Sequence, residues 1–377
     1  MRIVYCIAGT CNSGGMERVL TNKANYLVKH GYEVTIVTTD QRGEKPFFPL
    51  DKRIRCYDLG INYEENNGKS FFNKLIHYPF KQYKHKKRLS ALLKRLKADI
   101  VISMFCNDAS FLPSIQDGSR KVLEIHFSRF KRLQYGRKGL WKWADEYRSR
   151  QDVKVASRFD RFVVLTEEDK GYWGDLKNLC VIGNARTFVS PQPASLENKK
   201  VIAVGRYSYQ KGFDRLISAW SKVCHEVDDW KLHLVGDGEL RESLQQQINE
   251  LNLSESVVLG KAETDMLSVY RSASILAMSS HYEGLPMVLL EAQAVGLPIV
   301  SFACKCGPKD VVEDEVDGFL VEEGDVDALT NRLLMLMKDE DLRKRMGAAA
   351  FARSERYTEE RIMKRWMDLF EELAFKK

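Results

Sequence analysis

The stretch SILAMSSHYEGLPMVLLEAQAVG, residues 274–296, carries the pattern from which we infer the fold. Its apolar residues 275–278 predict a short buried strand, and the polar residues 279–284 predict a loop. Pro286 suits the first turn of a helix, and Gly296 suits its end, where the chain often adopts a left-handed conformation. The stretch therefore predicts a strand, a turn and the N-terminus of a helix.

Two glutamates flank the predicted start of this helix. Glu283 lies in the loop before it, and Glu291 lies four residues after Met287, on the same face of the helix. The backbone N–H groups between Gly284 and Met287 and the positive end of the helix dipole favour a bound phosphate. A sugar nucleotide, which has a phosphate flanked by hydroxyl-rich groups, would fit this arrangement. Glutamates at this spacing are equally typical of a solvated surface, so the residues alone leave both alternatives open.

The pattern E-G-L-P-x-x-L-x-E after an apolar strand, with a later G-L-P-I-V strand, resembles the donor-site signature of the retaining glycosyltransferases of family 4. The resemblance implies a fold of the α/β class called GT-B, in which two Rossmann-like doubly wound parallel-sheet domains face each other across a cleft. Glu283 would contact the donor sugar and stabilise positive charge on it, and Glu291 would bind the ribose hydroxyls. Four further residues of the stretch would bind the donor: Gly284, Leu285, Pro286 and Met287.

The length and composition are those of a globular protein with more than one domain. A chain of 377 residues suggests two domains of roughly 150 to 200 residues each. It contains no window of about 18 consecutive apolar residues and no recognisable signal peptide, so we expect a cytoplasmic protein. The eight cysteines are scattered and lack zinc spacing, which favours reduced thiols without a bound metal.

The net charge of +7 is unevenly distributed, and residues 81–97 and 129–150 hold much of the excess. The second segment also contains four aromatic residues: Phe130, Tyr135, Trp141 and Trp143. One interpretation is a solvated helix surface, and the other is a patch attracted to anionic lipid headgroups, with the tryptophans at the interface. The sequence has no helix-turn-helix, RNA-recognition or zinc signature, so we expect no nucleic-acid partner.

The N-terminal residues predict a βαβ unit of a parallel sheet, with a strand at 2–8, a helix at 16–30 and a strand at 33–38. The loop after the first strand is not a Walker A motif, because no Lys-Ser/Thr pair follows its glycines. Gly14 and Gly15 nevertheless let a ligand approach the backbone closely, and we expect them to bind the donor. The G-G-M-E-R-V sequence here is similar to a family 4 segment at the same place.

His126 follows a predicted strand at residues 121–125. In open α/β sheets ligands gather outside the carboxyl ends of the strands, so a histidine at this place can contact a ligand. A lone histidine is more often structural. Family 4 enzymes have a histidine after this strand that approaches the donor sugar, and the E-I-H-F-S sequence resembles that pattern, which implies a catalytic role for His126.

Two cations are predicted to meet at one edge of a second doubly wound sheet. Arg206 lies at the end of a predicted strand, and Lys211 precedes the next predicted helix. Together they can stabilise the negative charge that grows on a departing diphosphate. The G-R-x-x-x-x-K-G pattern is similar to the phosphate-binding pair of the family, which implies a donor-binding role for Gly205 and catalytic roles for Arg206 and Lys211.

Residues 181–199 contain two prolines and several turn formers, which predicts an interdomain linker. We expect an acceptor-binding domain at 1–185, a nucleotide-sugar-binding domain at 186–357 and a final helix at 358–377 that crosses back to the first domain. Family members usually have an N-P-V-type sequence in the linker. This chain has N-A-R at 184–186, so the conformation of the hinge is left open.

The expected reaction moves a hexosyl or N-acetylhexosaminyl group from a nucleotide diphosphate sugar to a hydroxyl of a glycan. Asp325-x-Asp327 looks like a helix cap rather than a metal-binding D-x-D pair, so we expect neither metal nor cofactor. The loop around Gly260 would contact the base, without distinguishing uracil from guanine. Front-side attack and double displacement through Glu283 both stay open.

The overall pattern resembles bacterial transferases that extend cell-surface or lipid-linked glycans. That resemblance implies a UDP-sugar donor, a polyprenyl-diphosphate-linked acceptor and a place at the anionic inner face of the cell membrane. Three alternatives are weighed against it: a soluble transferase for a small molecule, a non-catalytic sugar-binding protein, and a nucleic-acid-binding protein.

Overall fold

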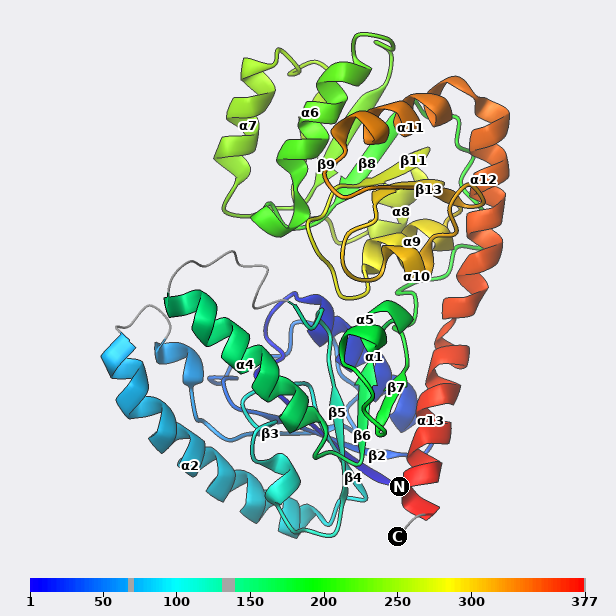
Figure 1. Cartoon of the computed structure of the whole chain (residues 1–377). Helices are drawn as coiled ribbons and strands as arrows, with labels where there is room; N and C mark the ends of the chain where they lie inside the picture. The colour runs from blue at the N-terminus through cyan, green and yellow to red at the C-terminus, as the bar shows by residue number, and fades with distance from the viewer. Residues whose placement is uncertain (67–70, 131–139, 376–377) are drawn as a thin grey trace. The chain divides into compact units, whose positions relative to one another are not determined.

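The computed structural model describes residues 1–66, 71–130 and 140–375 (Figure 1). It divides into two compact units. The first comprises Met1–Leu165, Tyr172–Ile182 and Ile362–Lys377, and the second comprises Thr166–Gly171 and Gly183–Arg361. The chain therefore passes from the second unit back into the first near its C-terminus.

The first unit contains a seven-stranded parallel sheet with the strand order β3-β2-β1-β4-β5-β6-β7. The order reverses between β1 and β4, and such a switch point is where open α/β sheets bind ligands. The strands are β1 (Arg2–Ile7), β2 (Glu33–Thr38), β3 (Arg55–Asp58), β4 (Ile100–Ser103), β5 (Arg120–Glu124), β6 (Arg161–Val164) and β7 (Leu179–Val181).

Helices cover this sheet because parallel strands, which are apolar on both faces, need partners on both. In α2 the buried residues Leu89, Leu92 and Leu93 recur at helical spacing and enter a core cluster together with residues of β1, β4, β5 and β6. The helices described in this unit are α1 (Gly15–Lys29), α2 (Phe71–Leu96), α4 (Leu140–Ala156) and most of α13 (Glu359–Phe375).

The second unit contains a six-stranded parallel sheet with the order β10-β9-β8-β11-β12-β13. Its strands are β8 (Lys200–Val204), β9 (Lys231–Val235), β10 (Val257–Leu259), β11 (Ile275–Met278), β12 (Ile299–Phe302) and β13 (Gly318–Val321). Its helices are α5 (Glu167–Tyr172), α6 (Phe213–Val223), α7 (Arg241–Glu250), α8 (Met266–Arg271), α9 (Met287–Ala294), α10 (Pro308–Val311), α11 (Val326–Lys338) and α12 (Glu340–Arg353). Five residues of α5 belong to this unit.

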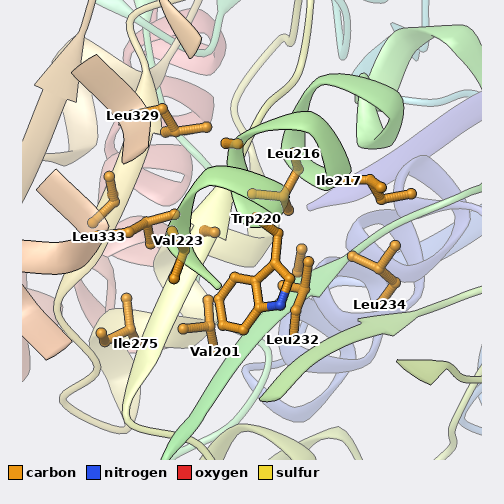
Figure 2. Packing of buried hydrophobic residues seen from close by; sticks show 14 of the residues in the cluster. Val201, Leu216, Ile217, Trp220, Val223, Leu232, Leu234, Ile275, Leu329 and Leu333 are labelled. Carbon is orange, nitrogen blue, oxygen red and sulfur yellow. The ribbon is translucent and has the colours of Figure 1, made fainter. Parts of the chain in front are cut away.

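Trp220 lies at the centre of the second core. It is fully buried on α6 and packs between that helix and strand residues such as Val201 and Leu232 (Figure 2). Its indole Nε1 donates a hydrogen bond to Ser256 Oγ over 3.3 Å, which satisfies the one polar atom of the ring. Leu333 of α11 joins the same cluster, so α6 and α11 are held against one face of the sheet.

The structure confirms the strand at residues 275–278 and the helix that follows it. Pro286 immediately precedes α9, and Gly296 adopts the left-handed conformation, with φ of +74°. Asp325 caps α11, as its position predicted, by accepting a hydrogen bond from Ala328 N over 2.8 Å. One boundary was wrong: Val181 is the last residue of β7 and not part of a linker.

The segment after Gly183 is anchored within the second unit through Arg186. The backbone N–H of Arg186 donates to Tyr357 O over 2.8 Å, and its guanidinium donates to Ser354 Oγ and Glu355 Oε1 over 2.6 and 3.0 Å. These three residues form the short turn that precedes α13. Arg186, which stands where the N-P-V-type family sequence has its valine, therefore connects the first residues of the second unit to the short turn at its C-terminal end.

Candidate active site

The loop between β8 and α6 brings Lys211 against Glu283. Lys211 Nζ donates a hydrogen bond to Glu283 Oε1 over 2.7 Å, and the two side chains are 18% and 7% exposed. Gly205 makes this geometry possible, because a Cβ there would lie 2.8 Å from Lys211 Cε. The structure therefore joins two of the predicted catalytic residues into one ion pair, with the stem of the lysine lying over the predicted glycine.

Two polar side chains complete the environment of the Glu283 carboxylate. Ser280 Oγ donates to Oε1 over 2.6 Å, and Gln210 Nε2 lies 3.4 Å from Oε2. The backbone N–H of Glu283 donates to Lys305 O over 2.8 Å, which fixes the loop itself. Sequence analysis missed Ser280 and Gln210, although each lies within three residues of a predicted site residue.

Arg206 lies in the same loop and is exposed. Within the described part of the chain, its guanidinium forms no hydrogen bond or ion pair. An arginine that the protein itself does not use is available for an anionic ligand.

The N-terminus of α9 presents backbone donors that the protein leaves unpaired. Among the described residues, the backbone N–H groups of Gly284, Leu285, Met287 and Val288 make no hydrogen bond. Pro286 separates them and has no N–H of its own. Unpaired donors at a helix N-terminus favour a bound anion, which is the geometry that the sequence prediction of a phosphate here requires.

Glu291 of α9 is held by two side chains of its own unit. Thr187 Oγ1 donates to Oε1 and Tyr270 OH donates to Oε2, each over 2.7 Å. Burial, and secondly the charge of Glu291, raise the pKa of Tyr270 well above its ordinary value, so the phenol keeps its proton and remains a donor. Both oxygens that were predicted to bind ribose hydroxyls thus already accept a hydrogen bond each.

Gly260 is fixed at the carboxyl end of β10. Its N–H donates to Leu234 O over 2.8 Å, and its carbonyl accepts from Tyr207 OH and Arg241 Nη1 over 2.9 and 2.8 Å. Burial raises the pKa of Tyr207 to about 12, so this buried phenol also stays protonated. Three hydrogen bonds therefore fix Gly260 at the start of the loop that is predicted to contact the base. The next residue, Lys261, is exposed.

His281 forms a second polar cluster beside the Lys211 loop, which sequence analysis did not identify. Its Nε2 lies 2.8 Å from Arg215 Nη2, and its ring stacks on Tyr209 with 4.1 Å between centroids. The backbone N–H of His281 donates to Gln210 O over 2.8 Å, which connects this cluster to the loop that carries Lys211. The only signal in the sequence was the position of His281 after an apolar strand.

Gly14 and Gly15 lie at the start of α1 in the first unit. Gly14 is the N-cap, and a Cβ on it would meet the carboxylate of Glu17 at 2.2 Å, the far end of a flexible side chain. A Cβ on Gly15 would meet nothing within 4 Å. No rigid neighbouring atom excludes a side chain at either position, so packing within the protein does not explain these two glycines. Close approach of a ligand stays the predicted reason for them.

His126 lies two residues after the end of β5, which stops at Glu124 and not at the predicted residue 125, and its side chain is 5% exposed. Its Nε2 is 2.9 Å from Glu124 Oε1, and Lys23 Nζ donates a hydrogen bond to that same oxygen. Burial raises the pKa of Glu124, but the charges of Lys23 and His126 outweigh it and lower this pKa to about 2. Sequence analysis missed both partners, although a lysine inside the apolar stripe of α1 was a signal.

The basic and aromatic segments of the first unit are only partly described. Residues 131–139, including Tyr135, lie outside the described residues, as does the side chain of Trp141. In the described part, the following aromatic side chains are exposed: Tyr78, Phe80 and Tyr83 of α2, and Trp143 and Tyr147 of α4. Lys86 and Lys87 of α2 are exposed as well.

The described residues contain neither a membrane-spanning helix nor a clustered metal site. None of the described helices combines the length and the apolar character that a membrane span requires. In the same residues, no cluster of three or more His, Cys, Asp or Glu side chains is arranged as a metal site.

Two family models together match almost the whole chain. Glycosyltransferase Family 4 matches residues 13–185, and Glycosyl transferases group 1 matches residues 186–353. The amylovoran biosynthesis glycosyltransferase AmsD of Erwinia amylovora is 30% identical, over 98% of this chain and 99% of that protein. An alpha-1,4-N-acetyl-D-galactosaminyltransferase of Campylobacter jejuni, named for a diNAcBac-PP-undecaprenol-linked acceptor, is 28% identical over 99% of each chain.

The fold is also that of solved structures. The crystal structure of S. aureus TarM in complex with fondaparinux, alpha-GlcNAc-glycerol and UDP matches with a TM-score of 0.77 and 18% identity. The match covers 98% of this chain and 99% of that chain. The two parallel Rossmann-like sheets are therefore those of a GT-B fold, as the sequence predicted.

Proposed function

We propose that this chain, which belongs to the family 4 glycosyltransferases, moves a hexosyl or N-acetylhexosaminyl group from a UDP-sugar to a hydroxyl of a glycan acceptor. The observation that carries the proposal is the convergence, in one unit, of the Lys211–Glu283 ion pair and the unpaired N–H groups at the start of α9. A cation and helix donors favour a diphosphate, and a carboxylate favours the sugar.

The leaving nucleotide diphosphate gains negative charge as the glycosidic bond breaks. Arg206 and Lys211 would stabilise this charge on the β-phosphate, assisted by the backbone donors of Gly284 to Met287. Because side chains and a helix N-terminus supply the positive charge, the reaction would need no divalent cation. Turnover should therefore persist in excess chelator. Loss of turnover on chelation, with recovery on adding Mg²⁺ or Mn²⁺, would refute the proposed independence from divalent cations.

Glu283 is better suited to stabilise the reacting sugar than to attack it. Its Oε1 accepts hydrogen bonds from Lys211 and Ser280, and a carboxylate with donors on its oxygens is a weaker nucleophile. This supports same-face attack with retention, in which the leaving phosphate takes the proton of the acceptor. Mass spectrometry of enzyme treated with a fluorinated donor should find no glycosyl adduct on Glu283, and an adduct would establish double displacement.

The sugar and base of the donor are supported by what is known of similar proteins. The Campylobacter relative is named for N-acetylgalactosaminyl transfer, and the TarM complex contains UDP. A panel of UDP- and GDP-sugars, scored by released nucleotide, tests the inference directly. Activity with GDP-mannose alone would overturn it, whereas activity with UDP-hexoses or UDP-N-acetylhexosamines would support it.

Removing Arg206 tests the site itself. The Arg206→Ala variant should lower kcat about a hundredfold or more, as expected when a donor to a developing charge is lost. Arg345 of α12 is also exposed and provides the control, since Arg345→Ala should leave kcat unchanged. Equal activities of the two variants would remove Arg206 from the catalytic machinery.

The acceptor is proposed to be lipid-linked, as part of bacterial cell-surface polysaccharide synthesis at the inner face of the membrane. Two relatives support this through their names, which refer to amylovoran biosynthesis and to an undecaprenol-linked acceptor. Phe80 and Tyr83 of α2 are each 67% exposed next to Lys86 and Lys87, an arrangement suited to an anionic headgroup layer. Each exposed lysine near such a surface contributes about 1 kcal/mol.

Vesicle flotation tests this placement. Binding should rise with the content of anionic lipid, fall with salt, and weaken when Lys84, Lys86, Lys87 and Arg88 are all changed to Gln. The matched control neutralises four exposed lysines of the second unit: Lys199, Lys231, Lys338 and Lys344. Protein that stays soluble under every condition would favour the alternative, a soluble transferase acting on a small-molecule acceptor.

A further inference from the structure

The carboxylate of Glu291 accepts a hydrogen bond at each of its two oxygens. Thr187 Oγ1 donates to Oε1 and Tyr270 OH donates to Oε2, each over 2.7 Å. Thr187 lies in the segment that opens the second unit, and Tyr270 lies on α8, so two separate elements reach one side chain of α9. Both distances are in the short range that is typical of a hydroxyl donating to a charged oxygen.

The two donors are themselves held in place. Tyr270 is fully buried, and its ring packs against Phe188, the sequence neighbour of Thr187, with 5.9 Å between ring centroids. Burial, and secondly the charge of Glu291, raise the pKa of Tyr270, so the phenol keeps the proton that it donates. Because an ionised carboxylate can only accept, the direction of both hydrogen bonds is fixed.

These contacts orient the carboxylate and still allow it to bind a ligand. Glu291 is partly exposed, and an ionised carboxylate has about four acceptor positions, of which the two hydroxyls occupy two. Thr187 and Tyr270 contribute no positive charge, so they orient the oxygens without neutralising them. One further acceptor position on each oxygen suits a pair of adjacent hydroxyl groups.

We propose that Thr187 and Tyr270 are positioning residues, which hold the Glu291 carboxylate in the orientation that accepts the 2′- and 3′-hydroxyls of the donor's ribose. The proposal rests on the proposed role of Glu291 as the ribose-binding residue. A glutamate side chain has several rotatable bonds, and ordering it when a ligand binds costs conformational entropy. The two hydroxyls restrict these rotations in the folded protein, before the nucleotide arrives.

A positioning role and a competing role predict different effects. If the two hydroxyls position the carboxylate, removing either of them should weaken its preference for a ribose that has both hydroxyls. If they only occupy acceptor positions, removing one frees a lone pair and should leave this preference unchanged or raise it. The direction of the change therefore decides between the two roles.

The experiment measures by calorimetry how much affinity the full-length protein loses when one ribose hydroxyl is deleted. The probe is UDP or GDP, whichever the parent binds more tightly, together with its 2′-deoxy and 3′-deoxy forms. The parent should bind each deoxy form about tenfold more weakly, because a hydrogen bond to a charged group is lost. Tyr270→Phe and Thr187→Val should each reduce this factor to about fourfold, and the double variant should reduce it to about twofold.

Two control variants keep the hydroxyl or remove one elsewhere. Thr187→Ser retains the hydroxyl and should keep the factor of the parent. Thr330→Val removes a buried threonine hydroxyl of α11, which donates to Val326 O over 2.8 Å, and should keep it as well. Each factor is a ratio measured on one protein, so partial unfolding of a sample does not change it. If one single variant does not fold, the other still gives the direction.

The outcomes separate the positioning role from the role of Glu291 itself. A factor that stays at the parent value or rises in both Tyr270→Phe and Thr187→Val overturns the proposal. If Glu291→Gln lowers the factor while those two variants keep it, Glu291 binds the ribose and the two hydroxyls only stabilise the fold. If Glu291→Gln keeps the factor, Glu291 does not bind the ribose and the positioning role is overturned with it. The donor panel tests glycosyl transfer separately, so neither failure decides that question.

Discussion

The loops that follow the first strand of each sheet differ in why they contain glycine. In the second unit, a Cβ on Gly212 would lie 2.3 Å from Ser279 O, and Gly212 has a φ of +58°. In the first unit, a Cβ on Gly15 would meet nothing within 4 Å. Both loops connect a buried strand to a helix at the carboxyl edge of a parallel sheet.

The difference shows that the same residue type can serve two purposes. Gly205 and Gly212 are needed by the fold, because they let the Lys211 loop pack against its own neighbours and so pre-organise the cation. Gly15 is not needed by any contact within the described residues, which leaves close approach of a ligand as its proposed purpose. Substitutions can separate an effect on stability from an effect on binding.

The largest expected effect comes from removing the cation that the second loop holds. Lys211→Met should lower kcat by a hundredfold to a thousandfold, about 3 to 4 kcal/mol in transition-state stabilisation. Lys222→Met is the control, because this exposed lysine of α6 forms a surface ion pair with Asp327. Near-normal turnover in Lys211→Met would mean that the pre-organised lysine is structural. The glycines of the second loop would then serve packing and not catalysis.

The next effect tests whether the second loop requires glycine for folding. Gly212→Ala should lower the free energy of unfolding by about 3 kcal/mol, because alanine disfavours a positive φ and its Cβ would clash with a backbone oxygen. Gly171→Ala in α5 should cause no loss, since its Cβ would meet nothing within 4 Å. Denaturant unfolding of both variants gives the answer, and equal stabilities would show that the loop can relax.

Acid should weaken the first unit through a buried histidine. Burial lowers the pKa of His85 to about 4, so the fold favours its neutral form. The corresponding stabilisation is complete above the unfolded pKa of about 6.5 and is lost as the pH falls towards 4, by roughly 2 to 3 kcal/mol. Relative to His85→Leu, the parent should lose this amount of unfolding free energy between pH 7 and pH 4.

Two comparisons isolate the contribution of His85. Burial raises the pKa of Asp108 to about 6, so Asp108 stabilises the fold below about pH 3.8 and loses that contribution as the pH rises through 6. The total pH profile of the protein is therefore flatter than that of His85 alone. His225→Leu in the second unit changes an exposed histidine and should leave the profile unchanged, so a similar change in both variants would contradict the prediction.

The smallest effect on stability, and a selective effect on binding, is expected at Gly15. Gly15→Ala should leave the free energy of unfolding unchanged or raise it by about 0.5 kcal/mol, since the position begins α1 and has free space. If a ligand approaches the backbone here, KM for the donor should still rise several-fold. Unchanged KM in a stable variant would remove Gly15 from the donor site.

Most of the fold could be predicted because its central strands and helices have strong local patterns. Residues 275–278 are uniformly apolar, and α6 buries residues at helical spacing, so both were identifiable from sequence. The strands β3 and β7 were not, because both are short edge strands that are only half covered: β3 has two charged residues among its four, and β7 has only three residues. Their position at the edges follows from pairing with β2 and β6, which no local pattern encodes.

The sequence by itself determined the fold class, the glycine-containing loops and the chemical types of the site residues, because these depend on local periodicity and on motifs within some ten residues. Only the tertiary structure decided which side chains pair. Lys211 and Glu283 are separated by 72 residues, and Lys23 and Glu124 by 101. The physical reason is that a charge is stabilised by whatever lies within a few ångströms of it, and parallel-sheet crossovers bring together strand ends from distant parts of the chain.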